Sequence, residues 1–171
     1  MIDAVTVEET WRRFGAFTEA QARREGQRVG REQPDLLAFV LALTQEFSPA
    51  AQELGVYLFH VVLAIFRAAG GRRVPRVKAG AIERQWSKNS EELERLEGAH
   101  ERFLERVALQ QVSAEPEVMR YVVEAVMEAG DDPDDPAELT EEDQAMLFLV
   151  LKTVVDLLRQ PNGRGRRLTR Q

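Results

Sequence analysis

The chain has 171 residues, of which 44% are hydrophobic, so it is long enough for one domain, or two small halves, with a buried core. It contains no cysteine, which excludes disulfide bonds, thiolate metal sites and a cysteine nucleophile, and which suits a reducing cytoplasm. The formal net charge is -6, and the N-terminus has acidic residues but no signal-peptide-like apolar run. We therefore expect a cytoplasmic protein.

Basic residues gather in one predicted loop and in the C-terminal tail. The loop carries Arg72, Arg73, Arg76 and Lys78, and the tail carries Arg159, Arg164, Arg166, Arg167 and Arg170. Removing these nine from the 23 basic residues leaves 14 against 29 acidic residues, a net charge of -15 for the remainder. Because such a body repels nucleic acid, only the loop and the tail could attract it, and we do not expect nucleic acid to be the main partner.

Apolar residues recur at every third or fourth position through the chain, whereas strand signals are almost missing, so we predict an all-α fold. A first helix should begin near Thr6, where Thr6 and Glu9 have the form of a capping box. This helix should present Val7, Trp11 and Phe14 along one face and then fade in the polar stretch QARREGQRVGREQ.

Prolines predict the starts of the next two helices. Pro34 suits the first turn of a helix, where its missing N–H would be unpaired anyway, and that helix should run to about Glu46. Ser48 and Pro49 suit the N-cap and first position of a third helix that ends at the pair Gly70 and Gly71. Its most apolar run, residues 54 to 69, is shorter than the roughly 20 residues that span a bilayer, so we expect a buried helix and no membrane partner.

Residues 79 to 110 have the longest helical pattern. Its apolar seam has the heptad spacing of a helix that packs lengthwise on its neighbours. The seam positions are Ile82, Trp86, Asn89, Leu93, Leu96, His100, Phe103 and Val107. A fifth helix should follow Pro116 and end at Gly130, and a sixth should run from a cap at Thr140 to about Leu158. We expect residues 161 to 171 to be disordered, because they have almost nothing to bury.

The two halves of the chain repeat one pattern. Val7 and Trp11 match Ile82 and Trp86 at one common offset, and Gln33-Pro34 matches Glu115-Pro116 at a slightly larger one. The apolar run that starts at Tyr57 matches the run that starts at Met146 at an offset that is larger again. The pattern predicts a compact six-helix bundle of two similar three-helix halves, residues 1–71 and 79–160, packed as one globule and joined by a basic linker, 72–78. Alternatively, the small alphabet of core residues makes any two amphipathic helical hairpins look alike.

One spacing suggests metal chemistry. Glu97 and His100 stand three positions apart, on one face of a helix, as in di-iron carboxylate bundles. That architecture needs the motif twice, but the second histidine, His60, has Tyr57 where a glutamate is required. The competing interpretation places His100 at a polar position of the helix seam, so no metal ligand or cofactor is expected.

Few residues of the chain suit nucleophilic catalysis, so we expect no enzyme. The leading hypothesis is a non-enzymatic interaction or regulatory protein that binds a partner protein or forms a homodimer. The candidate partner-binding residues are Trp86, Asn89, Leu93, Arg72, Arg73, Arg76 and Lys78. The alternatives are a metal protein or helical enzyme around Glu97 and His100, and a nucleic-acid accessory protein that uses the basic loop and tail.

Overall fold

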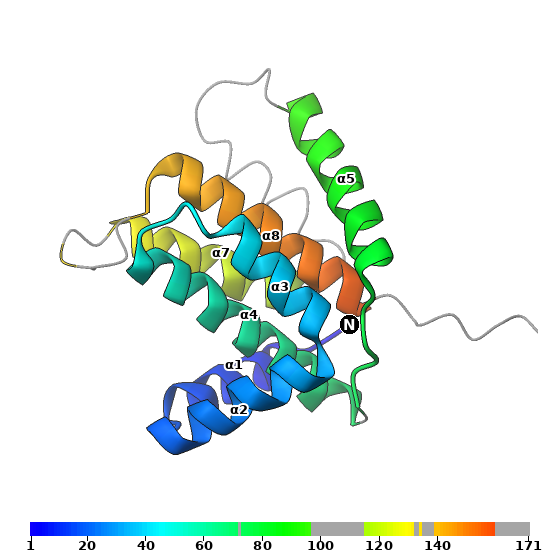
Figure 1. Cartoon of the computed structure of the whole chain (residues 1–171). Coiled ribbons are helices and arrows are strands. Elements are labelled where there is room, and N and C mark those ends of the chain that lie inside the picture. The colour runs from blue at the N-terminus through cyan, green and yellow to red at the C-terminus, as the bar shows by residue number, and fades with distance from the viewer. Residues whose placement is uncertain (72, 97–114, 132–133, 135–138, 160–171) are drawn as a thin grey trace, which may run out of the picture.

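The structure, a computed structural model, describes residues 1–71, 73–96, 115–131, 134 and 139–159. These residues form a compact arrangement of seven helices without a strand, which confirms the all-α prediction (Figure 1). The helices are α1 (Ala4–Gly15), α2 (Glu19–Glu32), α3 (Pro34–Leu43), α4 (Pro49–Gly70), α5 (Ala79–Leu96), α7 (Pro116–Asp131) and α8 (Glu141–Arg159). The predicted continuation of the long helix beyond Leu96 and the predicted disordered tail, 161–171, lie outside the described residues.

Helix α2 is the main difference from the predicted elements, because it occupies the polar stretch in which the first helix was expected to fade. Its start is fixed by a capping box in which the Thr18 hydroxyl accepts the Gln21 N–H at 3.2 Å and the Gln21 side chain accepts the Thr18 N–H at 2.9 Å. Arginine, glutamine, glutamate and alanine are good helix formers, so the helix forms although Val29 is its only buried residue. The predicted count of six helices does not include it.

The first helix begins earlier than predicted. Asp3 is its N-cap and accepts the Thr6 N–H at 2.8 Å, so Thr6 lies inside the helix. Helix α3 ends at Leu43, before the predicted Glu46, and the hydroxyl of Thr44 donates to the carbonyl oxygen of Val40 at 2.8 Å.

Other predicted helix ends are confirmed. Pro34 and Pro49 lie in the first turns of α3 and α4, and Pro116 begins α7. Gly71 ends α4 in the left-handed conformation, with φ 54°, which a residue with a side chain adopts at a cost. Thr140 caps α8 by accepting the Asp143 N–H at 3.1 Å.

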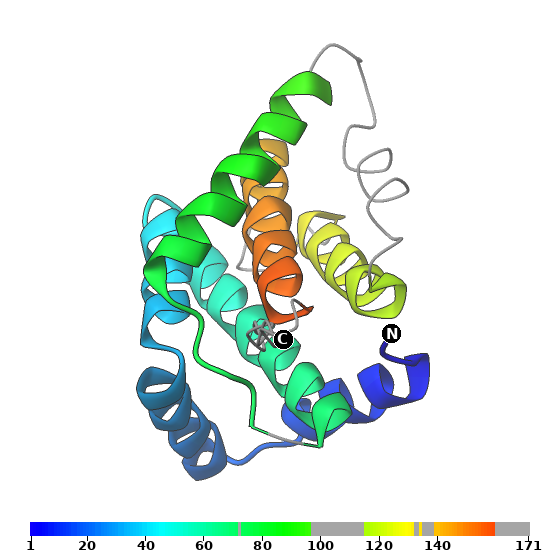
Figure 2. The ribbon, with the colours of Figure 1, turned by 90° about the vertical axis from the view of Figure 1, so that its right-hand side faces the viewer.

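Helices α4 and α8 form the centre of the molecule, and the other helices pack around them (Figures 1 and 2). Helix α1 lies on α4, and α5 lies on α8. Each of these outer helices also contacts a helix from the other end of the chain, because α1 packs on α7 and α5 packs on α3. The outer helix of each half of the chain therefore packs on both halves.

The α4–α8 contact is a close one. A Cβ atom at Gly55 would lie 3.1 Å from Cδ1 of Leu147, and Phe59 and Phe148 are buried in the same core. By length and composition alone α4 could cross a membrane, but half of its apolar window is buried inside the protein. That burial agrees with the core helix expected from the sequence.

Candidate functional site

The face of α5 that was predicted to receive a partner is largely used inside the protein. Trp86 packs edge-on against Phe39 of α3, with ring centroids 5.4 Å apart. Leu93 is half-buried against the core, and Asn89 is only 2% exposed. These three side chains contribute to the α5 seam and leave little free surface for a partner.

Asn89 belongs to a buried polar network between α5 and α8. Its amide nitrogen donates to the Thr153 hydroxyl at 3.0 Å and to the Asp156 carboxylate at 3.1 Å. The ammonium of Lys152 donates to the same Asp156 oxygen at 2.6 Å, and Gln85 donates to the Asn89 carbonyl at 3.0 Å. Because each group needs its partners, the network favours one register of α5 on α8.

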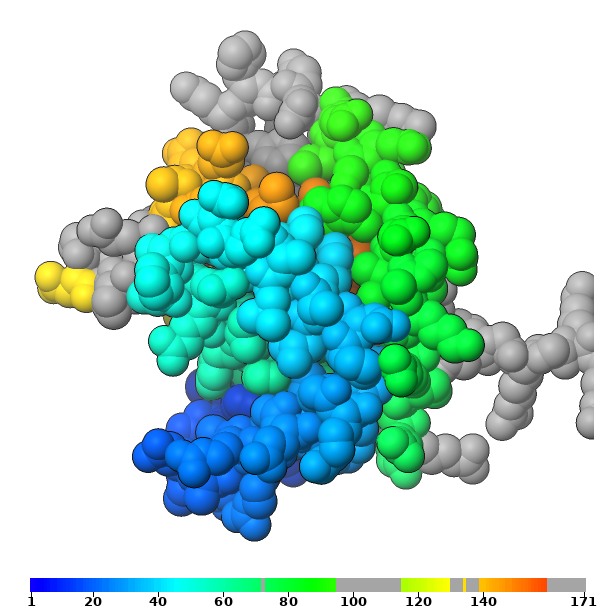
Figure 3. Space-filling model, viewed as in Figure 1, coloured from blue at the N-terminus to red at the C-terminus, as the bar shows by residue number. Residues whose placement is uncertain are grey.

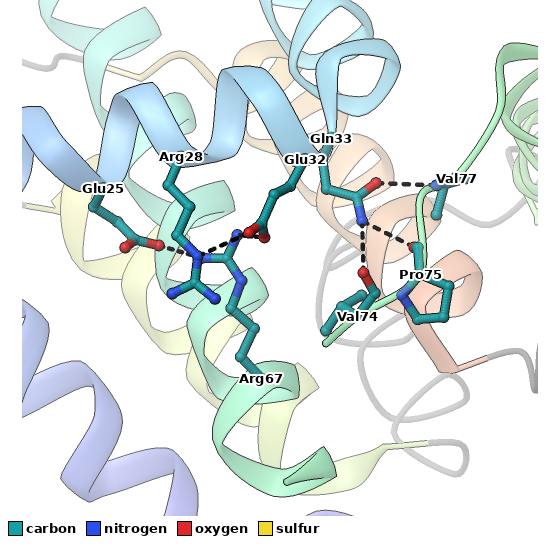
Figure 4. A network of polar contacts seen from close by, with 8 residues as sticks. All are labelled: Glu25, Arg28, Glu32, Gln33, Arg67, Val74, Pro75 and Val77. Carbon is teal, nitrogen blue, oxygen red and sulfur yellow. Dashed lines mark hydrogen bonds and ion pairs between the residues drawn. The ribbon is translucent and has the colours of Figure 1, made fainter. Parts of the chain in front are cut away.

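A second ionic network joins α2 to α4 (Figure 4). Arg67 of α4 has a side chain only 10% exposed, and it forms ion pairs with Glu25 and with Glu32, the latter at 2.9 Å. Arg28 donates from Nε to Glu32 at 3.1 Å. Burial alone would raise the pKa of Glu32, but the hydrogen bond from Arg28 and the charge of Arg67 outweigh burial and lower that pKa. Both inward glutamates of α2 are thus neutralised by arginine.

The basic linker is held by Gln33, which is 1% exposed at the start of α3. Its side-chain oxygen accepts the Val77 N–H at 3.0 Å, and its nitrogen donates to the Pro75 carbonyl at 2.9 Å (Figure 4). Asp35 of the same helix accepts the Ala79 N–H at 3.2 Å, at the start of α5. The linker backbone is therefore fixed on α3 before α5 begins.

The predicted basic residues of the linker lie at the surface where they are described. A guanidinium nitrogen of Arg76 lies 3.9 Å from a carboxylate oxygen of Asp35, and Lys78 is exposed. Arg73 is exposed beside an open hollow of about 430 Å³ at the ends of α4 and α8. Arg72 lies outside the described residues.

The N-terminus is held in the same way as the linker. The N–H of Ile2 donates to the carboxylate of Glu115 at 2.8 Å, and Glu115 is buried at the start of α7. Glu115 precedes Pro116, as Gln33 precedes Pro34. Gln33 and Glu115 therefore each bind the backbone that leads into an outer helix, α5 and α1 respectively.

Sequence reasoning missed an aromatic surface formed by Trp11 of α1, Tyr57 of α4 and Tyr121 of α7. Trp11 is 39% exposed and Tyr57 is 38% exposed, although both are large rings. Trp11 stacks on Tyr121 at a centroid distance of 6.5 Å and an interplanar angle of 15°. Burial raises the pKa of Tyr121, and the neighbouring Tyr57 raises it further. The sequence signal that could have pointed to this surface is the scarcity of these residue types. The chain has only two tryptophans and two tyrosines, and three of these four meet here.

The surroundings of the aromatic surface restrict its rings. Tyr57 meets Phe14 edge-on at 5.5 Å, and the Arg12 guanidinium lies 5.7 Å from the centre of the Trp11 ring. Arg12 is held in turn by an ion pair with Glu8. Trp11 and Tyr57 thus contact neighbouring side chains while both remain partly exposed to solvent.

Glu97 and His100, the candidate metal ligands, lie outside the described residues. Within the described part of the chain, no three histidine, aspartate or glutamate side chains are placed to hold a metal ion. His60 of α4 lies beside the rings of Phe14 and Phe59, and its buried Nε2 has no hydrogen-bond partner. Burial lowers the pKa of His60, although the charge of Glu25 opposes that shift. This environment suits a neutral core histidine.

The chain was also compared with known proteins. No protein family model, no curated protein and no solved structure matches it.

Proposed function

We propose that the protein is a non-enzymatic interaction module that binds a helix or peptide of a partner protein at the aromatic surface Trp11, Tyr57 and Tyr121. The observation that carries this proposal is the partial exposure of Trp11 and Tyr57 beside Tyr121. Tryptophan and tyrosine dominate the energetics of protein interfaces, because a rigid ring contributes a large contact area at a small cost in conformational entropy.

The position of the surface supports the same proposal. Trp11, Tyr57 and Tyr121 come from three helices that the core holds together, so the contact area exists before a partner arrives. The tyrosine hydroxyls and the Arg12 guanidinium supply polar groups beside the apolar rings, as in interfaces between separately folded proteins. This surface replaces the α5 face as the proposed partner site.

A photo-crosslinking experiment tests the proposal. The exposed Gly15 lies beside Tyr57, since a Cβ atom there would be 3.8 Å from its hydroxyl, so a photoreactive residue at Gly15 would report on the surface. We expect a discrete adduct in cells, a mapped partner segment, and direct binding of that purified segment by calorimetry. Trp11→Gln should abolish both signals, whereas Leu41→Ser, at an exposed residue of α3, should leave them intact. Binding that is indifferent to Trp11→Gln would refute the aromatic surface.

We also infer that the chain consists of two copies of one helical unit. The aromatic contact between Trp11 and Tyr121 corresponds to the contact between Trp86 and Phe39. The two tryptophans are equivalent positions of the repeat, and Phe39 and Tyr121 are related by the same offset as Pro34 and Pro116. A chance likeness of two amphipathic hairpins would not require the same pair of positions to touch in both places.

The backbone anchors repeat with the same offsets. Ile2 and Val77 are related by the same offset as Trp11 and Trp86. The Ile2 N–H binds Glu115, which precedes Pro116, and the Val77 N–H binds Gln33, which precedes Pro34. Thus α1 of the first unit is anchored at the start of α7, and α5 of the second unit is anchored at the start of α3. The helix packing has the same symmetry, since α1 contacts α4 and α7 while α5 contacts α8 and α3. This exchange is the geometry expected of a fused homodimer.

A circular permutant tests the duplication. Leu158, Arg159 and Ile2 line one hollow, so the end of α8 lies near the start of α1, as the end of α4 is joined to the start of α5. A permutant would begin at Val74, run to Arg159, continue through a copy of linker residues 71 to 76 into Ile2, and end at Gly71. We expect a cooperative thermal transition within a few degrees of the parent protein. A permutant that expresses but lacks a cooperative transition would contradict the equivalence of the two connections.

A further inference from the structure

Two adjoining hollows lie beside α2, which forms part of the molecular surface in Figure 3. One, of about 620 Å³, runs along α2, and the other, of about 440 Å³, lies between α1, α2 and α4. They share Phe17, Glu25 and Arg28, so they form one continuous depression, which we call the α2 groove. No predicted site residue lies in it.

The charge of the α2 groove follows from the ionic network beneath it. Arg67 binds Glu25 and Glu32 from below, and Arg28 also binds Glu32 (Figure 4). The acidic residues of α2 that could neutralise its outer face are therefore already paired. Among the residues that the structure describes, Arg24 and Arg31 make no ion pair or side-chain hydrogen bond.

The arginines are aligned along the groove. Arg24, Arg28 and Arg31 are spaced four and three positions apart, which places them on one side of α2. Arg13 of α1 lies at the edge of the second hollow and likewise has no ion pair in the described structure. The groove thus presents an excess of guanidinium groups, which bind carboxylates through two parallel hydrogen bonds.

The floor of the groove is partly apolar. Phe17 is half-buried, lines both hollows, and packs on Phe14 at a centroid distance of 4.7 Å. Phe14 in turn meets Tyr57, so the apolar floor continues toward the aromatic surface. A ligand that fits this groove has negative charges for the arginines and an apolar group for Phe17.

We propose that the α2 groove binds an acidic, amphipathic segment of a partner protein, in which carboxylates meet Arg13, Arg24 and Arg31 and an apolar side chain contacts Phe17. This inference rests on the proposed function and adds the chemistry of the partner. Charge also argues against nucleic acid, because residues 115 to 143 contain twelve acidic residues and one basic residue. A long polyanion is repelled by that region, whereas a short acidic peptide stays within the α2 groove.

Binding of a synthetic probe to the full chain tests this inference. The probe is a fluorescently labelled peptide of three EEFL repeats, followed by anisotropy at two salt concentrations. We expect saturable binding that weakens with salt, and an affinity at least about tenfold lower for the variant Arg24→Glu/Arg31→Glu. The matched control is Arg84→Glu/Lys88→Glu on α5, which changes the net charge equally at exposed residues. Its affinity should stay within about twofold of the parent protein, because charges far from the groove act only through a screened field.

Several outcomes would overturn the inference. They are equal losses in the two charge-reversed variants, equal binding of a peptide with glutamine in place of each glutamate, and tighter binding of a thymidine oligonucleotide than of the peptide. Circular dichroism melts of both variants show whether a loss of binding reflects unfolding. Conservative replacement, Arg24→Lys/Arg31→Lys, should restore much of the affinity, which a merely misfolded groove would not do.

A further pair of measurements separates this inference from the proposed function. Trp11→Gln should abolish binding of the crosslinked partner segment but change the affinity for the acidic peptide by less than about threefold, because Trp11 does not line the groove. If the partner segment from crosslinking is basic, the inference about α2 fails while the aromatic surface stands. Concentration-dependent self-association that Arg24→Glu/Arg31→Glu abolishes would assign the groove to the acidic region of a second copy, and so overturn the choice of a foreign partner.

Discussion

In the proposed repeat of two helical units, the α1–α4 seam and the α5–α8 seam occupy corresponding places, but they use opposite chemistry. In the first seam Phe14 packs against Tyr57 and His60, so the contact is aromatic. In the second, Asn89 stands at the position equivalent to Phe14 and binds Thr153 and Asp156. The same helix arrangement is therefore compatible with either kind of contact.

The two seams place their charged groups differently. In the first seam Arg67 binds the glutamates of α2, and the ionic network lies outside the aromatic contact. In the second, Asp156, which stands at the position equivalent to Arg67, binds Asn89 and Lys152 within the seam itself. One seam is stabilised mainly by apolar burial, and the other gains specificity of register from polar groups that must all be satisfied.

The largest effect should come from removing Arg67, the cation of the ionic network that joins α2 to α4. Arg67→Met leaves Glu25 and Glu32 without their buried partner, and we expect a loss of about 3 kcal/mol in the free energy of unfolding. Urea denaturation measures this loss. Arg24→Met on the exposed side of α2 is the control and should change stability by less than about 0.5 kcal/mol. An Arg67→Met protein as stable as the control would show that the buried network contributes nothing.

The second seam should respond in two opposite ways. Lys152→Met leaves Asp156, which is 18% exposed, with only neutral partners, and we expect a loss of about 2 kcal/mol, less than for a wholly buried charge. The triple variant Asn89→Leu/Lys152→Leu/Asp156→Leu gives this seam the apolar character of the first, and should recover most of that loss. Urea denaturation decides between the two. If the triple variant is less stable than Lys152→Met, the polar network stabilises the fold as well as its register.

The smallest effect concerns pH and His60, whose counterpart in the second half is Leu149. Because burial lowers the pKa of His60, the unfolded chain binds a proton near the ordinary value of 6.5 while the folded protein does not. The resulting stability is present above pH 6.5 and is lost as the pH falls toward the lowered pKa. His60→Leu should therefore lose less stability than the parent protein between about pH 7.5 and about pH 5.5, measured by urea denaturation at both values. Parallel losses would indicate that His60 is protonated equally in both states.

Much of the local structure was predictable from neighbouring residues. Pro34, Pro49 and Pro116 marked helix starts, and Gly71 marked a helix end, because proline and glycine restrict or free the backbone wherever they stand. Helix α2 was missed, although the capping box of Thr18 and Gln21 was visible in the sequence. Because this stretch lacks an apolar face, the first helix was expected to fade in it, yet the glutamates of α2 are held by Arg67 of α4.

The site was less predictable than the fold. The seam pattern of Trp86, Asn89 and Leu93 identified a packing face correctly, but it could not tell whether that face meets the protein itself or a partner. Trp11 was placed on one face of the first helix with Val7 and Phe14, and its stacking on Tyr121, in the other half of the chain, could not be inferred from spacing along one helix.

The amino-acid sequence alone was enough to predict that this protein is helical, where most of its helices begin, and which sequence patterns recur between its halves. Those features depend on backbone restriction, capping and periodicity, which act over a few residues. Three features became visible only in the folded structure: each outer helix is anchored on the opposite half, Asn89 is buried, and Trp11, Tyr57 and Tyr121 share one surface. These outcomes depend on which faces of distant helices meet, and burial of one helix face is equally favourable against many partners until the whole core is packed.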